Sequence, residues 1–177
     1  MLPTYRFLFV TGSVVLTPFV SFAAEKAPAD SAAGMSVRAT VTVVDFGDHS
    51  SAVLTTKAWA AYEAKDSAAV AAYTGRCREL YFAEALRQQA ALTAPIPATE
   101  TERISAQWAL NDVGTCLYIM AQTHERDGQI DDAVALYRVL VERLAYAQCW
   151  DVKGWFWSPV DAAKGRLRAI EFERAGF

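Results

Sequence analysis

The sequence has few cysteines and no excess of positive charge. Three Cys in 177 residues are too sparse for a small scaffold held by disulfides, and the odd number leaves at least one thiol free or paired between chains. Lys and Arg number 17 against 20 Asp and Glu, a formal net charge of −3. We expect no nucleic-acid partner, because this balance provides no basic field. The hydrophobic fraction of 53% is ample for the core of one domain.

The chain also lacks the patterns that hold cofactors or carry catalysis. His49 and His124 fall in different predicted elements, and neither has a third nitrogen ligand or a Cys pair at zinc spacing beside it. No glycine-rich phosphate loop, nucleophile elbow or dinucleotide fingerprint occurs. No pair of carboxylates stands in the apolar setting that glycoside hydrolysis needs. We expect no cofactor, no metal site and no catalytic residues, and so no enzyme.

The longest apolar stretch lies at the N-terminus. Residues 1–23 contain one charge, Arg6, then an apolar run and a small-residue cut site at 21–23. This order predicts a secretory signal peptide cleaved after Ala23. Polar residues interrupt the run, which is too short for a membrane span, and no Cys stands at the cut site for a lipid anchor. We therefore expect an exported protein, periplasmic or secreted and not a lipoprotein, that meets the membrane only through export.

The remaining chain reads as a leader followed by helices. Residues 24–50 predict a flexible leader and a short extended arm, because 24–35 are small and polar and 37–44 are β-branched. Gly75, inside the second predicted helix, suggests a close helix–helix approach. Thr99 with Glu102 forms a capping box, and Ser158 precedes a first-turn Pro. Five helices are expected, over 51–64, 67–92, 100–126, 130–145 and 159–174, which makes an all-α fold.

Residues 114–147 carry a repeat pattern. Large, small, aromatic and glycine positions recur as in a 34-residue helical hairpin; the matching residues are Leu117, Met120, Ala121, His124, Gly128, Ile130, Ala133, Tyr137 and Leu140. This stretch resembles a tetratricopeptide repeat (TPR). The resemblance implies TPR-like antiparallel helix hairpins in a right-handed superhelical stack over 51–174. Residues 51–92 resemble a degenerate repeat, 100–147 the clearer repeat and 158–174 the capping helix of such arrays.

The resemblance implies a binding face. TPR arrays present the first helix of each repeat along a concave groove that takes peptides or partner proteins. Mapped onto this sequence, that groove carries Trp59, Tyr62, Thr115, Tyr118, Gln122, Glu125 and Arg126. Aromatic rings beside polar donors suit a peptide groove. We expect an interaction module that binds a protein or peptide partner in the cell envelope, or a second copy of this chain.

A second function class rests on an aromatic cluster at Trp150, Trp155, Phe156 and Trp157. Segments 54–59, 77–81, 111–116, 146–151 and 154–157 resemble small exported bacterial TPR proteins, some of which carry names that link them to β-glucanases. An exposed cluster would be a stacking platform for sugar rings, and so would suit a glycan-associated protein that binds β-glucan or assists a hydrolase. We expect instead that the irregular segment 146–157 folds over the helical stack and buries its rings.

The cysteines leave two pairings open. Cys116 lies near the start of one predicted helix and Cys149 just after the end of its antiparallel partner, so these ends meet and a Cys116–Cys149 disulfide is the first expectation. Cys77 lies on an apolar stripe, where it is a core residue or faces Cys116. The third alternative is that no bridge forms.

Overall fold

The computed structural model describes residues 44–151 and 153–176, which belong to one unit of the chain. The predicted signal peptide and the leader and arm up to residue 43 lie outside these residues. No helix in the described ranges is long and apolar enough to cross a membrane. The elements are α1 (Ser51–Glu63), α2 (Ser67–Ala90), α3 (Thr101–Ser105), α4 (Trp108–Arg126), α5 (Ile130–Arg143), β1 (Cys149–Asp151), β2 (Trp155–Trp157) and α6 (Pro159–Arg174).

Local sequence signals set the ends of the outer helices. The Ser50 hydroxyl accepts a hydrogen bond from the Val53 N–H at 3.4 Å, and the Asp66 carboxylate accepts one from the Ala69 N–H at 2.9 Å. These bonds satisfy donors that the first turns of α1 and α2 leave open. Ser158 does the same for α6, as predicted, by accepting from the Asp161 N–H at 3.1 Å.

The predicted helix over 100–126 is two helices. The chain breaks at Ala106 and Gln107, between α3 and α4. Glu100 rather than Thr99 precedes α3, and it makes no side-chain capping bond, so the predicted capping box is wrong. One side chain of α2 and one of α4 stabilise the break. The Gln88 amide oxygen accepts a hydrogen bond from the Leu110 N–H at 2.9 Å, and the Asn111 amide donates one to the Ile104 carbonyl at 2.8 Å.

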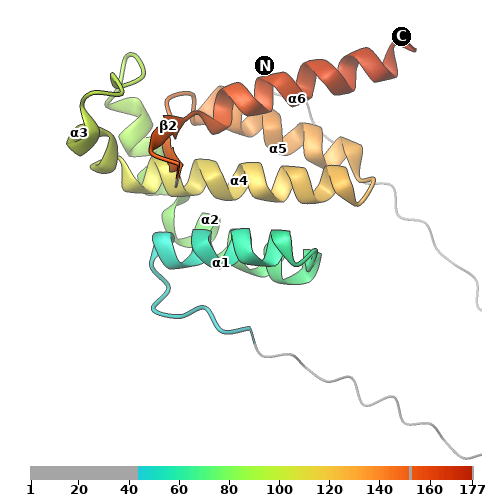
Figure 1. Ribbon diagram of the computed structural model, residues 1–177, viewed down its shortest axis with the longest axis horizontal. Helices are drawn as coiled ribbons and strands as arrows, with labels where there is room; N and C mark the ends of the chain where they lie inside the picture. Colours follow the sequence, from blue (N-terminus) through green and yellow to red (C-terminus); the bar gives the residue numbers. More distant parts are fainter. Residues whose placement is uncertain (1–43, 152, 177) are drawn as a thin grey trace, which may run out of the picture. The chain divides into compact units, whose positions relative to one another are not determined.

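The long helices alternate in direction along the chain, so that α2 and α5 run antiparallel to α4, and α1 and α6 run parallel to it (Figure 1). Helix α1 packs on α2, both pack on α4, and α4 also contacts α5 and α6. At Gly114 in α4, an added Cβ would lie 2.8 Å from the Ala147 Cβ, which shows that α4 passes close to the turn after α5. Gly75 in α2 has no such neighbour within 4 Å, so the close approach predicted there is wrong.

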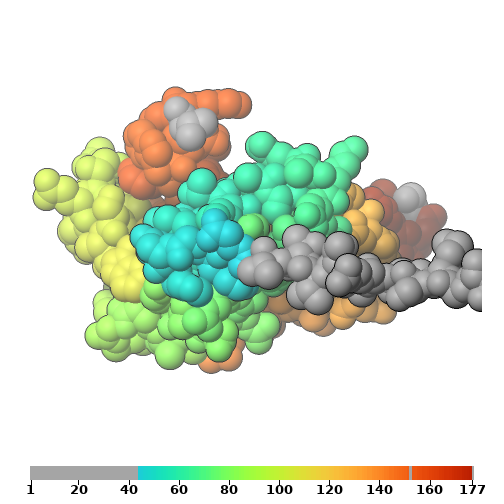
Figure 2. Space-filling view, turned by 90° about the horizontal axis from the view of Figure 1, so that it is seen from below, coloured from blue at the N-terminus to red at the C-terminus, as the bar shows by residue number. Residues whose placement is uncertain are grey.

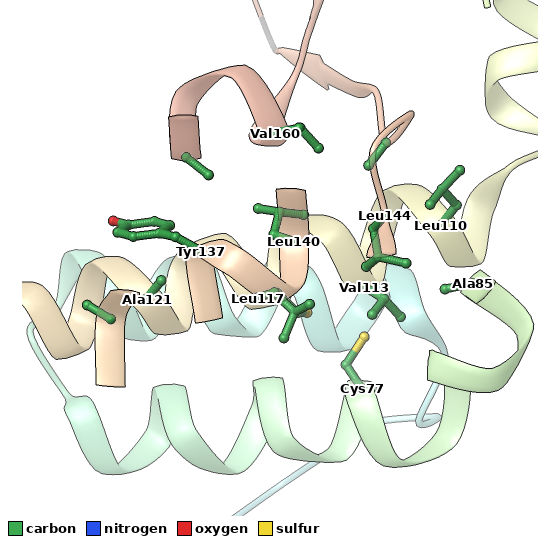
Figure 3. Packing of buried hydrophobic residues seen from close by; sticks show 14 of the residues in the cluster. Cys77, Ala85, Leu110, Val113, Leu117, Ala121, Tyr137, Leu140, Leu144 and Val160 are labelled. Atoms are coloured by element: carbon green, nitrogen blue, oxygen red, sulfur yellow. The ribbon is translucent and has the colours of Figure 1, made fainter. Parts of the chain in front are cut away.

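The main core lies on both sides of α4 (Figure 3). On one side, Cys77 of α2 points toward Val113 and Leu117 of α4. On the other side, Leu140 and Tyr137 of α5 are fully buried. Because α4 contributes buried residues around most of its circumference, it is the central helix that fixes the positions of the others.

A β-hairpin, here called the hairpin, joins α5 to α6 where an irregular segment was expected. Strands β1 and β2 pair antiparallel, with Cys149 opposite Trp157 and Trp150 opposite Phe156. Before the hairpin, Gln148 is held by the Asn111 amide oxygen at 2.9 Å and by two hydrogen bonds with the backbone of Ile96. After it, Pro159 is fully buried. Both ends of the hairpin are therefore fixed to the helical body.

Candidate functional site

One face of α4 carries most of the predicted partner-binding residues. Asn111, Thr115, Tyr118, Gln122 and Glu125 follow one another at intervals of four and three residues, which places them on one side of the helix. We call this side the groove face. The structure divides the groove face into an open half near Gln122 and a half covered by the hairpin.

The open half is a pocket of about 310 Å³. Tyr62 of α1, Gln122, Glu125 and Arg126 of α4 and Arg166 of α6 line it. Four of these five were predicted from the sequence, and the structure brings them together. A volume of this size is at the lower end of ligand pockets and suits one or two side chains or a short piece of backbone.

Glu125 is the electrostatic centre of the pocket. Its carboxylate accepts hydrogen bonds from the guanidinium of Arg166 and, at 2.9 Å, from the hydroxyl of buried Tyr137. Burial by itself would raise the pKa of Glu125, but the hydrogen bonds from Arg166 and Tyr137 outweigh it, so this pKa lies below its usual value. Burial and the Glu125 carboxylate raise the pKa of Tyr137. The carboxylate is therefore ionised and held in place at neutral pH.

Arg126 also lines the pocket, and it connects the C-terminal end of α4 to the turn between α1 and α2. It donates to the Tyr62 carbonyl at 3.1 Å and to the Ser67 hydroxyl at 2.9 Å, and its Nε lies 3.1 Å from the Asp127 carboxylate. Its guanidinium also lies over the Tyr62 ring, 5.2 Å from the centroid. A cation over an aromatic face is attractive, so these contacts fix Tyr62 against α4. The α1–α2 turn is thereby tied to the end of α4.

The pocket still offers hydrogen-bond donors. A guanidinium has five N–H groups that can donate hydrogen bonds. Within the described residues, Arg126 donates three hydrogen bonds and Arg166 donates two, so both keep N–H groups for a ligand. The Gln122 amide makes no hydrogen bond within the described ranges. Trp59 stands behind Tyr62, with ring centroids 5.8 Å apart and nearly perpendicular planes. The pocket therefore suits a ligand that presents oxygen acceptors beside an aromatic wall.

The covered half of the groove face is closed to a partner in this structure. Thr115 is only 4% exposed, because the Cys149 thiol of β1 lies against its hydroxyl. Tyr118 lies beside Trp157 of β2, with ring centroids 5.4 Å apart. Thr115 is therefore buried and not exposed in the groove as expected, whereas Tyr118 is half-buried beside Trp157. The hairpin occupies the place that was assigned to the partner.

Two indoles of the aromatic cluster are exposed, against the expectation of burial. Trp150 is 59% and Trp155 53% exposed, and the hairpin that carries them stands out from the helical body in orange in Figure 2. The Trp150 ring packs edge-on against Phe156 at 5.0 Å. Side chains alternate between the two faces of a strand. Trp150 and Phe156 therefore occupy one face of the hairpin, and Trp155 and Trp157 occupy the other.

All three cysteines are free thiols, so the Cys116–Cys149 disulfide is absent and the alternative without a bridge describes the structure. Consecutive residues of a helix point about 100° apart. Cys149 lies over Thr115, whereas Cys116 points toward α1 and α2, where it contacts the Thr55 hydroxyl at 3.4 Å. The neighbouring Cys77 thiol and burial hold the pKa of Cys116 well above its usual value.

Arg166 is the pocket residue that the sequence did not reveal. Its contact with Glu125 depends on how α6 crosses α4, and the two residues are 41 positions apart. The described residues contain no group of three His, Cys, Asp or Glu that could hold a metal ion. Comparison of the chain with family models, with curated proteins and with solved structures finds no match.

Proposed function

We propose that this chain is an exported, non-catalytic, TPR-like interaction module that binds a partner polypeptide on the groove face of α4. The pattern of helix–helix contacts supports the TPR-like arrangement. In each helix pair the first helix packs on the second, α1 on α2 and α4 on α5. The first helices also pack on one another, since α1 contacts α4 and α4 contacts α6. Helix α6 closes the stack against α5 and α4, as a capping helix would.

The single observation that carries the proposal is the pocket around Gln122. Four of the seven residues assigned to the binding face from the repeat pattern line one hollow, to which the free amide of Gln122 and two arginines contribute. Amide and guanidinium donors bind the backbone carbonyls of an extended peptide, and the rings of Tyr62 and Trp59 accept its apolar side chains. The occupant we propose is therefore an extended segment of a cell-envelope protein.

Site-specific crosslinking tests this proposal. A photoreactive amino acid replaces Gln122 in the full chain, and a matched control carries it at Glu142, on the exposed side of α5. We expect a discrete adduct from Gln122 and none from Glu142. The crosslinked peptide is then synthesised, and its affinity is measured by calorimetry for the wild type and for the Trp59→Ala and Gln122→Ala variants.

Two outcomes would refute the proposal. In one, both positions give the same adducts, which would indicate random contact. In the other, the synthesised peptide binds the wild type and both variants equally well. Adducts formed only with a second copy of this chain would make self-association the function of the groove face.

A second candidate is a glycan-associated role for the aromatic cluster. Its support is the exposure of Trp150 and Trp155, since exposed indoles stack on sugar rings. Because the two indoles lie on opposite faces of the hairpin, each would hold a separate sugar ring. Affinity electrophoresis in gels with soluble β-glucan tests this role. Retardation that disappears in the Trp150→Ala/Trp155→Ala double variant would support it, and unretarded migration of the wild type would exclude it.

A further inference from the structure

The groove face of α4 is longer than the pocket. Asn111, Thr115 and Tyr118 continue the line of Gln122 and Glu125 toward the N-terminal end of α4. They are covered by residues of the same chain, since β1 packs on α4 and β2 places Trp157 against Tyr118. The base of the hairpin thus covers the groove face at Thr115 and Tyr118, while Trp150 and Trp155 are exposed.

Side chains at the ends of β1 and β2 dock the hairpin on α4. The Cys149 thiol contacts the Thr115 hydroxyl and lies 3.4 Å from the Asn111 carbonyl. Trp157 meets Tyr118 edge-on. A neutral thiol is a weak hydrogen-bond group, so the ring contact is the stronger of the two. Trp150, on the opposite face of the hairpin, and Trp155, farther from its base, are both exposed.

The hairpin has little stability of its own. Each strand is three residues long and has a single partner strand, and an isolated two-stranded hairpin is marginal in water. Its ends are nevertheless fixed, by the hydrogen bonds of Gln148 and by buried Pro159. Segments with few buried contacts between fixed ends open locally, at a lower free energy than the whole fold.

We infer that the hairpin is a docked lid that lifts from α4 between its fixed ends and uncovers Thr115 and Tyr118. This inference rests on the proposed function, because the uncovered residues extend the same groove face. With the lid closed, a partner reaches only the pocket around Gln122. With the lid open, an extended segment of the partner replaces β1 and runs the length of α4.

The three thiols provide a test that needs no partner. The full chain is treated with iodoacetamide at pH 8, and the modification of each Cys is followed by peptide mass spectrometry. Cys77 and Cys116 are fully buried between α2 and α4 and report opening of the core. Cys149 is half-buried in the closed structure, and burial raises its pKa to about 12, which slows its reaction. We expect Cys149 to react faster than the two core thiols in the wild type, so the lifting of the lid is measured by how its rate changes in variants of the hairpin.

Two tryptophan variants decide between local and global opening. Trp157→Ala removes the docking ring, and we expect it to raise the Cys149 rate at least roughly tenfold, since an aromatic pair contributes up to about that factor beyond its buried area. The protection of Cys77 and Cys116 should not change, which also proves that the variant is folded. Trp155→Ala is the matched control, because the Trp155 indole is exposed and makes no recorded ring contact within the described residues.

The inference is overturned if Trp157→Ala leaves the Cys149 rate at the wild-type or Trp155→Ala value. It is also overturned if the three thiols always react together, because the hairpin would then open only when the core unfolds. Neither outcome affects the proposed function, which the crosslinking at Gln122 tests separately. A hairpin that never lifts would leave the pocket intact as the whole binding site.

Discussion

Replacing two glycines by alanine tests the packing of α4 quantitatively. Gly75 and Gly114 both lie inside helices, where alanine is more favourable than glycine by about 1 kcal/mol. At Gly75 an added Cβ has no neighbour within 4 Å, so Gly75→Ala should raise the free energy of unfolding by about that amount. At Gly114 the added Cβ would lie 2.8 Å from the Ala147 Cβ, which is too close for two methyl groups. Neither atom belongs to a flexible chain end that can turn away.

The expected result at Gly114 is the difference of two effects. Overpacking a core costs about 1–3 kcal/mol, against the helix gain of about 1 kcal/mol. Gly114→Ala should therefore lower the free energy of unfolding by about 0–2 kcal/mol. Urea titrations of both variants and the wild type, followed by circular dichroism at 222 nm, measure this directly. If Gly114→Ala stabilises the protein as much as Gly75→Ala does, α4 does not approach the Ala147 turn as described.

Three further substitutions test single contacts by the same urea titration. Burial raises the pKa of Asp112 despite a hydrogen bond from Ser51, and a raised carboxyl pKa makes the fold less stable as pH rises through it. Asp112→Asn should therefore stabilise the protein at pH 7 and be neutral at pH 3. An effect that does not depend on pH would contradict this. Ser158→Ala removes the α6 cap and should cost about 1 kcal/mol; no loss would mean that the cap is not formed. Tyr137→Phe removes a hydrogen bond to Glu125 and should cost about 1 kcal/mol at pH 7. Because the pKa of Glu125 is depressed, that cost should shrink as pH falls below the usual Glu range, and a constant cost would refute the assignment.

The sequence was informative wherever structure depends on near neighbours. Ser50 and Ser158 begin helices because their side chains bond backbone groups three residues away. The resemblance to a tetratricopeptide repeat assigns Gln122, Glu125 and Arg126 to a binding face, and all three lie at one end of α4 and line one pocket. These signals are complete within a few residues, which is why they could be interpreted from one sequence.

Features that depend on distant partners were missed. The break between α3 and α4 is held by Gln88, which lies 22 residues before Leu110. The hairpin was not foreseen because its strands are three residues long, too short for a pattern of alternation to stand out. The Cys116–Cys149 disulfide is absent for a related reason, since helix ends that meet do not by themselves bring two thiols together. Cys116 contacts Thr55 of α1, whereas Cys149 lies over Thr115, on another side of α4.

The fixed ends of the hairpin have a consequence for how this protein can change. Cys149 and Trp157 are cross-strand partners, so the two points where the hairpin leaves the helical body are only about 5 Å apart. A loop between such close ends can be lengthened cheaply, since each doubling of its length costs only about 0.6 kcal/mol in closure entropy. The hairpin is therefore an insertion site: new sequences grafted there would alter what reaches the groove face while helices α1 to α6 keep their packing.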